Sequence, residues 1–151
     1  EKALSAQLVL TAYIPMLMGT GGNSGSQSSV TVIRGISLGE IEFRDIPKVL
    51  WKEFRVAILC GISLAIVSFI RIMIIDKLLL GVNISFMIAL VICLTLCVTI
   101  FCAKLMGSLL PLVAKKIGFD PAVMASPFIS TIVDTVTLLV YMELATVLLH
   151  I

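Results

Sequence analysis

Long apolar stretches follow one another along this chain, separated by short polar segments. A helix needs about 20 mostly apolar residues to cross a hydrocarbon core of about 30 Å. The apolar stretches predict four such helices, at about residues 4–22, 56–75, 84–105 and 122–149. We therefore expect residues 1–151 to form an all-α integral membrane domain, a helical bundle of four transmembrane helices.

The composition supports a membrane protein rather than a soluble domain. Hydrophobic residues make up 60% of the chain and charged residues only 13%, against roughly 25% charged residues in soluble domains. The net charge of +2 is too small to indicate nucleic acid as a partner. No nucleophile and base stand in an arrangement suited to hydrolysis, so we expect no enzyme. The expected surroundings are a lipid bilayer.

Two polar connections separate the predicted spans. Residues 30–55 mix charged side chains with apolar ones and Trp51, which predicts a connection that contains an amphipathic helix lying on the membrane surface. Residues 106–121 form the other connection, into which the third helix can continue as far as Lys115 and Lys116. The end of this connection predicts a new helix start, with Asp120 as the N-cap and Pro121 at the first helical position.

The distribution of lysine and arginine predicts the orientation, because cytoplasmic connections carry an excess of these residues. Both ends of the chain and the turn near residues 76–83 are then extracytoplasmic, in a plasma membrane. An N-terminus outside implies an odd number of earlier spans, so we expect a fragment of a protein with at least five spans. Eight of the eleven basic residues lie in or next to the two connections: Arg34, Arg44, Lys48, Lys52, Arg55, Lys104, Lys115 and Lys116.

A glycine-rich polar segment, residues 19–29, follows the first apolar stretch. The lysine of a phosphate-binding loop is missing from it. Irregular backbone within a membrane is tolerated where it lines a water-filled passage. We therefore interpret the segment as irregular backbone, with Gly21, Gly22 and Asn23 lining a pore. An ordinary glycine-rich turn is the alternative.

Asp134 is an acid near the middle of the last predicted span. An ionised carboxylate at that depth costs at least about 2.5 kcal/mol, so it must face protein or water. Helical spacing aligns it with other oxygen-bearing side chains. A protonated or hydrogen-bonded structural acid is one interpretation, and a cation ligand is the other. The side chains near its stripe are Ser126, Ser130, Thr131 and Thr137, and we expect Thr131 and Thr137 to line a pore.

Hard oxygen donors favour Mg²⁺, Ca²⁺ or a similar ion. The four cysteines lie in apolar stretches and are expected to pack rather than bind metal. One carboxylate is a sparse site, whereas a homodimer would bring two copies of Asp134 to one axis. Mg²⁺ gives up its waters reluctantly, so it could pass there largely hydrated.

Four motifs together resemble the transmembrane domain of the MgtE family of magnesium channels. They are PMLMGTGGNSGSQS at 15–28, IRG at 33–35, DPA at 120–122, and SP at 126–127 followed by Asp134. The resemblance extends over essentially the whole chain. It implies a homodimer with five helices per subunit, a pore on the two-fold axis, and a Mg²⁺ site toward its cytoplasmic half.

The resemblance also implies site residues and missing parts. It centres the Mg²⁺ site on Asp134, with Ser126 where family members often have Asn, and with Ser130 where a small residue turns its carbonyl to the pore. It implies that this chain lacks the first span, a cytosolic N-terminal domain and a CBS domain pair.

Three functions remain open on the sequence. The leading hypothesis is a channel that conducts Mg²⁺ through a dimeric pore, with Asp134 as the pore carboxylate. The second is a secondary carrier that couples the cation to protons or Na⁺, with Asp134 taking up the coupling ion. The third is a membrane scaffold that transports nothing.

Overall fold

The computed structural model describes residues 2–124 and 126–149, with side chains for residues 8–123 and 127–149. Its long helices are α1 (Lys2–Ser37), α2 (Ile46–Arg71), α3 (Phe86–Lys116) and α4 (Ser126–Leu149). Three short segments join them: η1 (Phe43–Asp45), the π-helical η2 (Ile72–Leu79) and η3 (Pro121–Met124). The described residues contain helices and connections but no strand, which confirms the all-α class.

Three stretches of the described residues are long and apolar enough to cross a membrane: Phe43–Leu79, Phe86–Lys116 and Pro127–Leu149. The chain is therefore a multi-pass membrane protein. The other predicted span, residues 4–22, lies in α1, and the side chains of its first residues lie outside the described part. Four spans in this chain thus stay a prediction.

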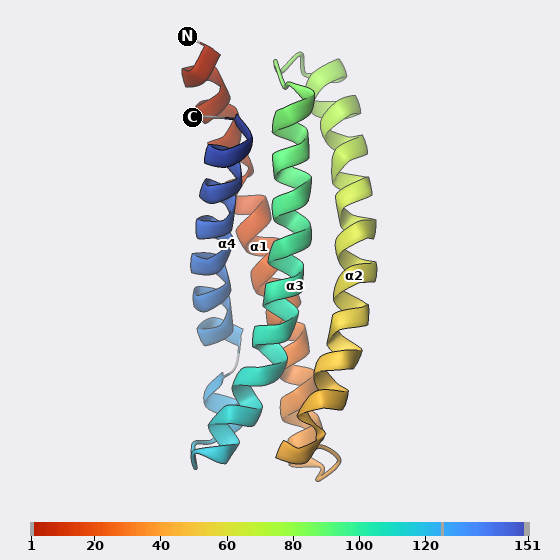
Figure 1. Cartoon of the computed structure of the whole chain (residues 1–151), viewed down its shortest axis with the longest axis vertical. Coiled ribbons are helices and arrows are strands. Elements are labelled where there is room, and N and C mark those ends of the chain that lie inside the picture. Colours follow the sequence, from red (N-terminus) through yellow and green to blue (C-terminus); the bar gives the residue numbers. More distant parts are fainter. Residues whose placement is uncertain (1, 125, 150–151) are drawn as a thin grey trace.

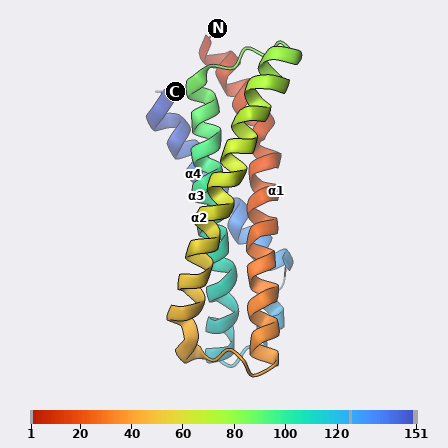
Figure 2. The same cartoon turned by 90° about the vertical axis from the view of Figure 1, so that its right-hand side faces the viewer.

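The helices form an elongated bundle around α3 (Figures 1 and 2). Helix α3 packs against α1, α2 and α4; α1 also packs against α4, whereas α2 packs mainly on α3. The start of α1, the end of α4 and the α2–α3 turn lie at one end, at the top of Figure 1. These segments thus lie at the same end of the bundle, and the side of the membrane that they face stays a prediction. We call the other end, where α1 joins α2 and α3 joins α4, the basic end.

Most of the core lies between α1 and α3. One buried cluster lies in the half of the bundle away from the basic end and includes Leu17, Ile92 and Tyr141. A smaller one, formed by Ala103, Ile129 and Val133, joins α3 to α4 nearer the basic end. The sides of α2 that face away from α3 expose large apolar residues such as Leu59 and Val67, as expected for contact with lipid.

The predicted irregular backbone at residues 19–29 is wrong, because the whole segment belongs to α1. Glycine lowers helix propensity, but tertiary packing can override propensity. Here the glycines let neighbouring helices approach: a Cβ at Gly25 would lie 2.9 Å from Ile129 Cγ2 and 3.1 Å from the carbonyl oxygen of Ala103. The polar and glycine residues of this segment therefore do not mark a loop.

The predicted surface-lying helix within residues 30–55 is also wrong. Helix α1 continues to Ser37, and α2 starts at Ile46 and runs through residue 55 into the apolar stretch without a break. Pro47 stands in the first turn of α2, where a missing N–H costs nothing. Thus the connection between these helices is short, and Glu53 is buried instead of lying on a surface helix.

Helices α3 and α4 differ from the predicted spans at the basic end. Helix α3 reaches Lys116, the continuation that the sequence left open, and Lys104 is buried within the bundle rather than lying near a connection. The predicted single helix over 122–149 begins instead with η3, and α4 starts at Ser126. The side chain of Asp120 caps this start as expected, accepting a hydrogen bond from the Ala122 N–H at 2.9 Å.

Candidate functional site

The side chain of Asp134 lies against the glycine-rich part of α1. A Cβ added at Gly22 would lie 3.6 Å from Asp134 Oδ1 and 3.3 Å from Ser130 Oγ. Ser130 and Asp134 are one helical turn apart on α4, so both face the same side of it. The absent side chain at Gly22 is what gives these oxygens room beside α1.

One turn along α1, Ser26 continues this polar contact. Its hydroxyl oxygen lies 3.5 Å from that of Ser130, and either can donate the hydrogen bond. Ser26, Ser130 and Asp134 are all partly buried, so they lie at the edge of the α1–α4 interface rather than in its interior. We call the set of Gly22, Ser26, Ser130 and Asp134 the α1–α4 polar edge.

Two residues predicted to line a pore lie inside the helical bundle instead of at this edge. Thr137 is buried, and its hydroxyl donates to the carbonyl of Val133. A Cβ at Gly21 would meet Thr99 Cγ2 at 2.5 Å and Thr137 Oγ1 at 3.1 Å. The hydroxyl of Thr99 has no hydrogen-bond partner among the described residues. Gly21 and Thr137 therefore serve close packing between α1, α3 and α4 in this chain.

The remaining predicted site residues are exposed or not described. Asn23 and Thr131 are exposed, and the Thr131 hydroxyl donates to the carbonyl of Pro127 in its own helix. The side chain of Ser126 lies outside the described residues, although its backbone begins α4. Its role as a ligand stays a prediction.

The carboxylate of Asp134 makes no hydrogen bond or ion pair with the part of the chain that the structure describes. Nor do any three His, Cys, Asp or Glu side chains of that part gather as a metal cage. The side-chain oxygens at the polar edge are those of one carboxylate and two hydroxyls, all hard oxygen ligands of the kind that suits Mg²⁺ or Ca²⁺. One chain can thus offer only part of a coordination shell.

Sequence reasoning did not single out two polar residues of these helices, of which one belongs to the polar edge and the other does not. Ser26 follows Gly22 by four positions, and that spacing could have marked it as a neighbour on the same face of a helix. Glu143 is a second acid of α4 and is exposed in a hollow lined by Val98, Leu139, Val140 and Leu144. Its apolar surroundings differ from those of Asp134.

The comparisons with known proteins all match this chain to the same family. A family model described as "MgtE: Divalent cation transporter" matches residues 14–144. The chain is 32% identical over 150 residues to the magnesium transporter MgtE of Thermus thermophilus, and 32% identical over 154 residues to that of Bacillus subtilis. Identity to the magnesium transporter MgtE of Enterococcus faecalis is 30% over 151 residues.

These alignments cover nearly all of this chain but a minor part of each relative. Each includes 99% of this chain and 32% of the relative. The chain therefore spans about a third of the length of the curated relatives that it matches.

Proposed function

This chain belongs to the MgtE family of divalent cation transporters, and from that premise we propose that it conducts Mg²⁺ across the membrane through a pore shared by two copies of the chain. In this proposal Asp134 is the pore carboxylate, and Ser130 and Ser126 are further oxygen ligands. The family is one of transporters, in agreement with the expectation that the chain is not an enzyme. The resemblance noted from the motifs is thereby confirmed.

The observation that carries the proposal is the carboxylate of Asp134 at the α1–α4 polar edge, which pairs with none of the described residues. Leaving an acid without a partner within a membrane is costly, and such acids mark ion pathways. Asp134 is partly exposed and faces Gly22, so its oxygens are accessible from outside the protomer. A cation and its waters would compensate the charge.

A second copy of the chain would complete the site. Exposed Asn23 and Thr131 stand on the two helices that form the polar edge, and such polar side chains are poorly suited to lipid. A two-fold axis beside this edge would cover it and bring the two Asp134 carboxylates together. Mg²⁺ holds its waters at about 2.1 Å, so a hydrated ion would keep the facing carboxylates about 8 to 9 Å apart.

Transport by the purified protein in liposomes tests the role of Asp134. With a Mg²⁺-sensitive dye inside the liposomes, Asp134→Ala should reduce uptake to the level of empty liposomes. Glu143→Gln is the matched control, since Glu143 lies in the same helix but among apolar residues. We expect it to retain most of the uptake. Unchanged uptake in Asp134→Ala would refute the assignment.

The same liposomes separate conduction from coupling. Passive conduction predicts uptake that follows the Mg²⁺ gradient and the membrane potential. If uptake instead required a proton or Na⁺ gradient, the proposal of a channel would fail and a coupled secondary carrier would be supported.

A cross-linking experiment tests the shared pore. Asp134→Cys, in a background without the native cysteines, should give a covalent dimer with a bis-maleimide whose spacer is about 8 Å. Glu143→Cys is the control and should give much less dimer. Equal dimer yields from both variants would contradict a two-fold axis beside Asp134.

A further inference from the structure

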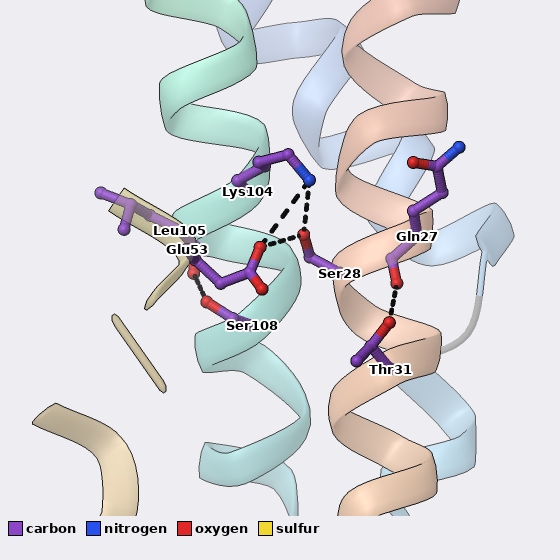
Figure 3. A network of polar contacts seen from close by, with 7 residues as sticks. All are labelled: Gln27, Ser28, Thr31, Glu53, Lys104, Leu105 and Ser108. Carbon is purple, nitrogen blue, oxygen red and sulfur yellow. Dashed lines mark hydrogen bonds and ion pairs between the residues drawn. The ribbon is translucent and has the colours of Figure 1, made fainter. Parts of the chain in front are cut away.

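A buried network of charged and polar side chains joins three helices near the basic end (Figure 3). The Ser28 hydroxyl on α1 donates to Glu53 Oε2 on α2 at 2.6 Å. Lys104 Nζ on α3 donates to the same hydroxyl at 3.3 Å and lies 3.7 Å from Glu53 Oε2. The charged side chains are each 8% exposed. Ser28 is therefore the point at which α1 is attached to the buried ion pair.

Because Glu53 and Lys104 are buried, their contact with Ser28 restricts the position of α1. Taking two charges out of water costs several kcal/mol per ion, and their attraction offsets the cost only when the geometry is good. A shift or rotation of α1 would remove Ser28 from Glu53 and Lys104 and leave the pair less well compensated. The network thus favours one position of α1 against α2 and α3.

The backbone contact beside the network restricts α1 further. A Cβ at Gly107 on α3 would overlap the carbonyl oxygen of Gly25 on α1, so the two backbones touch there. Gly25 lies between Gly22 and Ser28 along the helix. At about 1.5 Å of rise per residue, Ser28 is only about 3 Å along the axis from Ser26. A displacement at Ser28 is therefore passed directly to the polar edge.

We propose that Glu53 and Lys104 are positioning residues for the cation pathway: through Ser28 they hold α1 so that Gly22 and Ser26 face Asp134 and Ser130. This inference rests on the proposed function. It assigns no contact with the ion to either residue. Their effect on transport passes through the position of α1.

The decisive variant removes the network without leaving a buried charge. Replacing a buried ion pair by apolar residues of similar volume is often neutral or stabilising, so Glu53→Leu combined with Lys104→Met should fold. The matched control treats the ion pair near the other end in the same way, as Asp76→Leu combined with Arg71→Met. That pair contacts α1 at Tyr13 and Met16, whose positions lie about 20 Å and about 15 Å along the helix from Ser26.

Two measurements follow the position of α1 and the transport separately. The first is the rate of disulfide formation between Ser26→Cys and Ser130→Cys, in a background whose four native cysteines are alanine. The second is the initial rate of Mg²⁺ uptake at saturating Mg²⁺ with both serines intact. We expect the Glu53 and Lys104 double variant to lower both rates roughly fivefold, and the control to leave both nearly unchanged.

A milder pair of variants keeps the test valid if a double variant fails to fold. Ser28→Ala detaches α1 but leaves the ion pair intact. Ser108→Ala is its control, because Ser108 is also buried but donates only to the carbonyl of Leu105 in its own helix (Figure 3). Ser28→Ala should lower the disulfide rate about twofold and Ser108→Ala should not.

Each result has a defined meaning. If the parent's disulfide rate persists in the Glu53 and Lys104 double variant, or in Ser28→Ala where the double variant does not fold, the network does not position α1. An equal decrease in the controls would show a general loss of packing and would also refute the proposal. If the parent conducts no Mg²⁺, the proposed function fails, and the disulfide rates still decide whether the network positions α1.

Discussion

Two buried polar networks hold α1 near opposite ends of the bundle, and they differ in how much of their charge is buried. Near the basic end, Glu53 and Lys104 are both 8% exposed. Near the other end, the side chain of Asp76 is 9% exposed, but its partner Arg71 is 46% exposed. Water can therefore solvate one member of the second pair and neither member of the first.

The two networks also contact α1 differently. Tyr13 donates to Asp76 Oδ2 at 2.6 Å, while Arg71 lies 3.5 Å from Asp76 Oδ1. Asp76 belongs to the π-helical segment η2, next to an exposed turn, whereas Glu53 and Lys104 lie within long, regular helices. From this comparison we expect the position of α1 to be held more strictly at Ser28, near the basic end, than at Tyr13.

The largest expected effect comes from removing one charge from each pair. Lys104→Met leaves Glu53 buried without its cation and should lower the free energy of unfolding by about 3 to 5 kcal/mol. Arg71→Met removes a half-exposed cation and should cost about 1 kcal/mol or less. Unfolding in detergent by a graded SDS titration measures both. Equal losses would remove the contrast between the two ends.

The next effect concerns the backbone contact near the basic end. Gly107→Ala places a methyl group against the Gly25 carbonyl and should destabilise the protein by about 1 to 3 kcal/mol. Gly61→Ala is the control, since a Cβ there would lie 3.5 Å from its nearest neighbour, in ordinary contact. The control should change stability by less than about 0.5 kcal/mol. Melting temperatures of the purified variants compare the two changes. An unchanged melting temperature in Gly107→Ala would show that α1 can move away from α3.

The smallest effect is expected at Tyr13. Tyr13→Phe removes the hydrogen bond to Asp76 but keeps the ring, and the carboxylate retains Arg71, so the loss should be about 1 kcal/mol. Mg²⁺ uptake by this variant should stay close to that of the parent, because the change lies far from Asp134. A large decrease in uptake at unchanged stability would mean that the end near the termini also controls the pathway.

The apolar stretches predicted helix type and approximate position well, because crossing a bilayer demands a long apolar helix whatever its neighbours are. Boundaries were less predictable. The apolar stretch of α3 ends near residue 105, and the continuation to Lys116 was left open on the sequence, since a helix continues through polar residues when nothing stops it. The glycine-rich segment was misread because glycine permits both a loop and a close helix contact.

For the candidate site as well, the sequence predicted one part and not another. Asp134 could be identified from sequence, because an acid in the middle of an apolar helix is anomalous on its own. Its neighbour Gly22 was grouped with Gly21, yet the two adjacent glycines face different surroundings, Asp134 in one case and Thr99 with Thr137 in the other. One step along a helix turns the chain by about 100°, so adjacent residues of one helix can face the polar edge and the packed core.

The sequence by itself determined that this is a helical membrane protein of a cation transporter family and that one acid of the last helix has no obvious compensation. Only the tertiary structure decided which charges compensate one another. Ser28 and Lys104 are 76 positions apart, and Glu53 stands in a segment that resembled a surface helix. The local sequence pattern indicates how polar a segment is. The pairing of buried charges depends on which helices pack side by side.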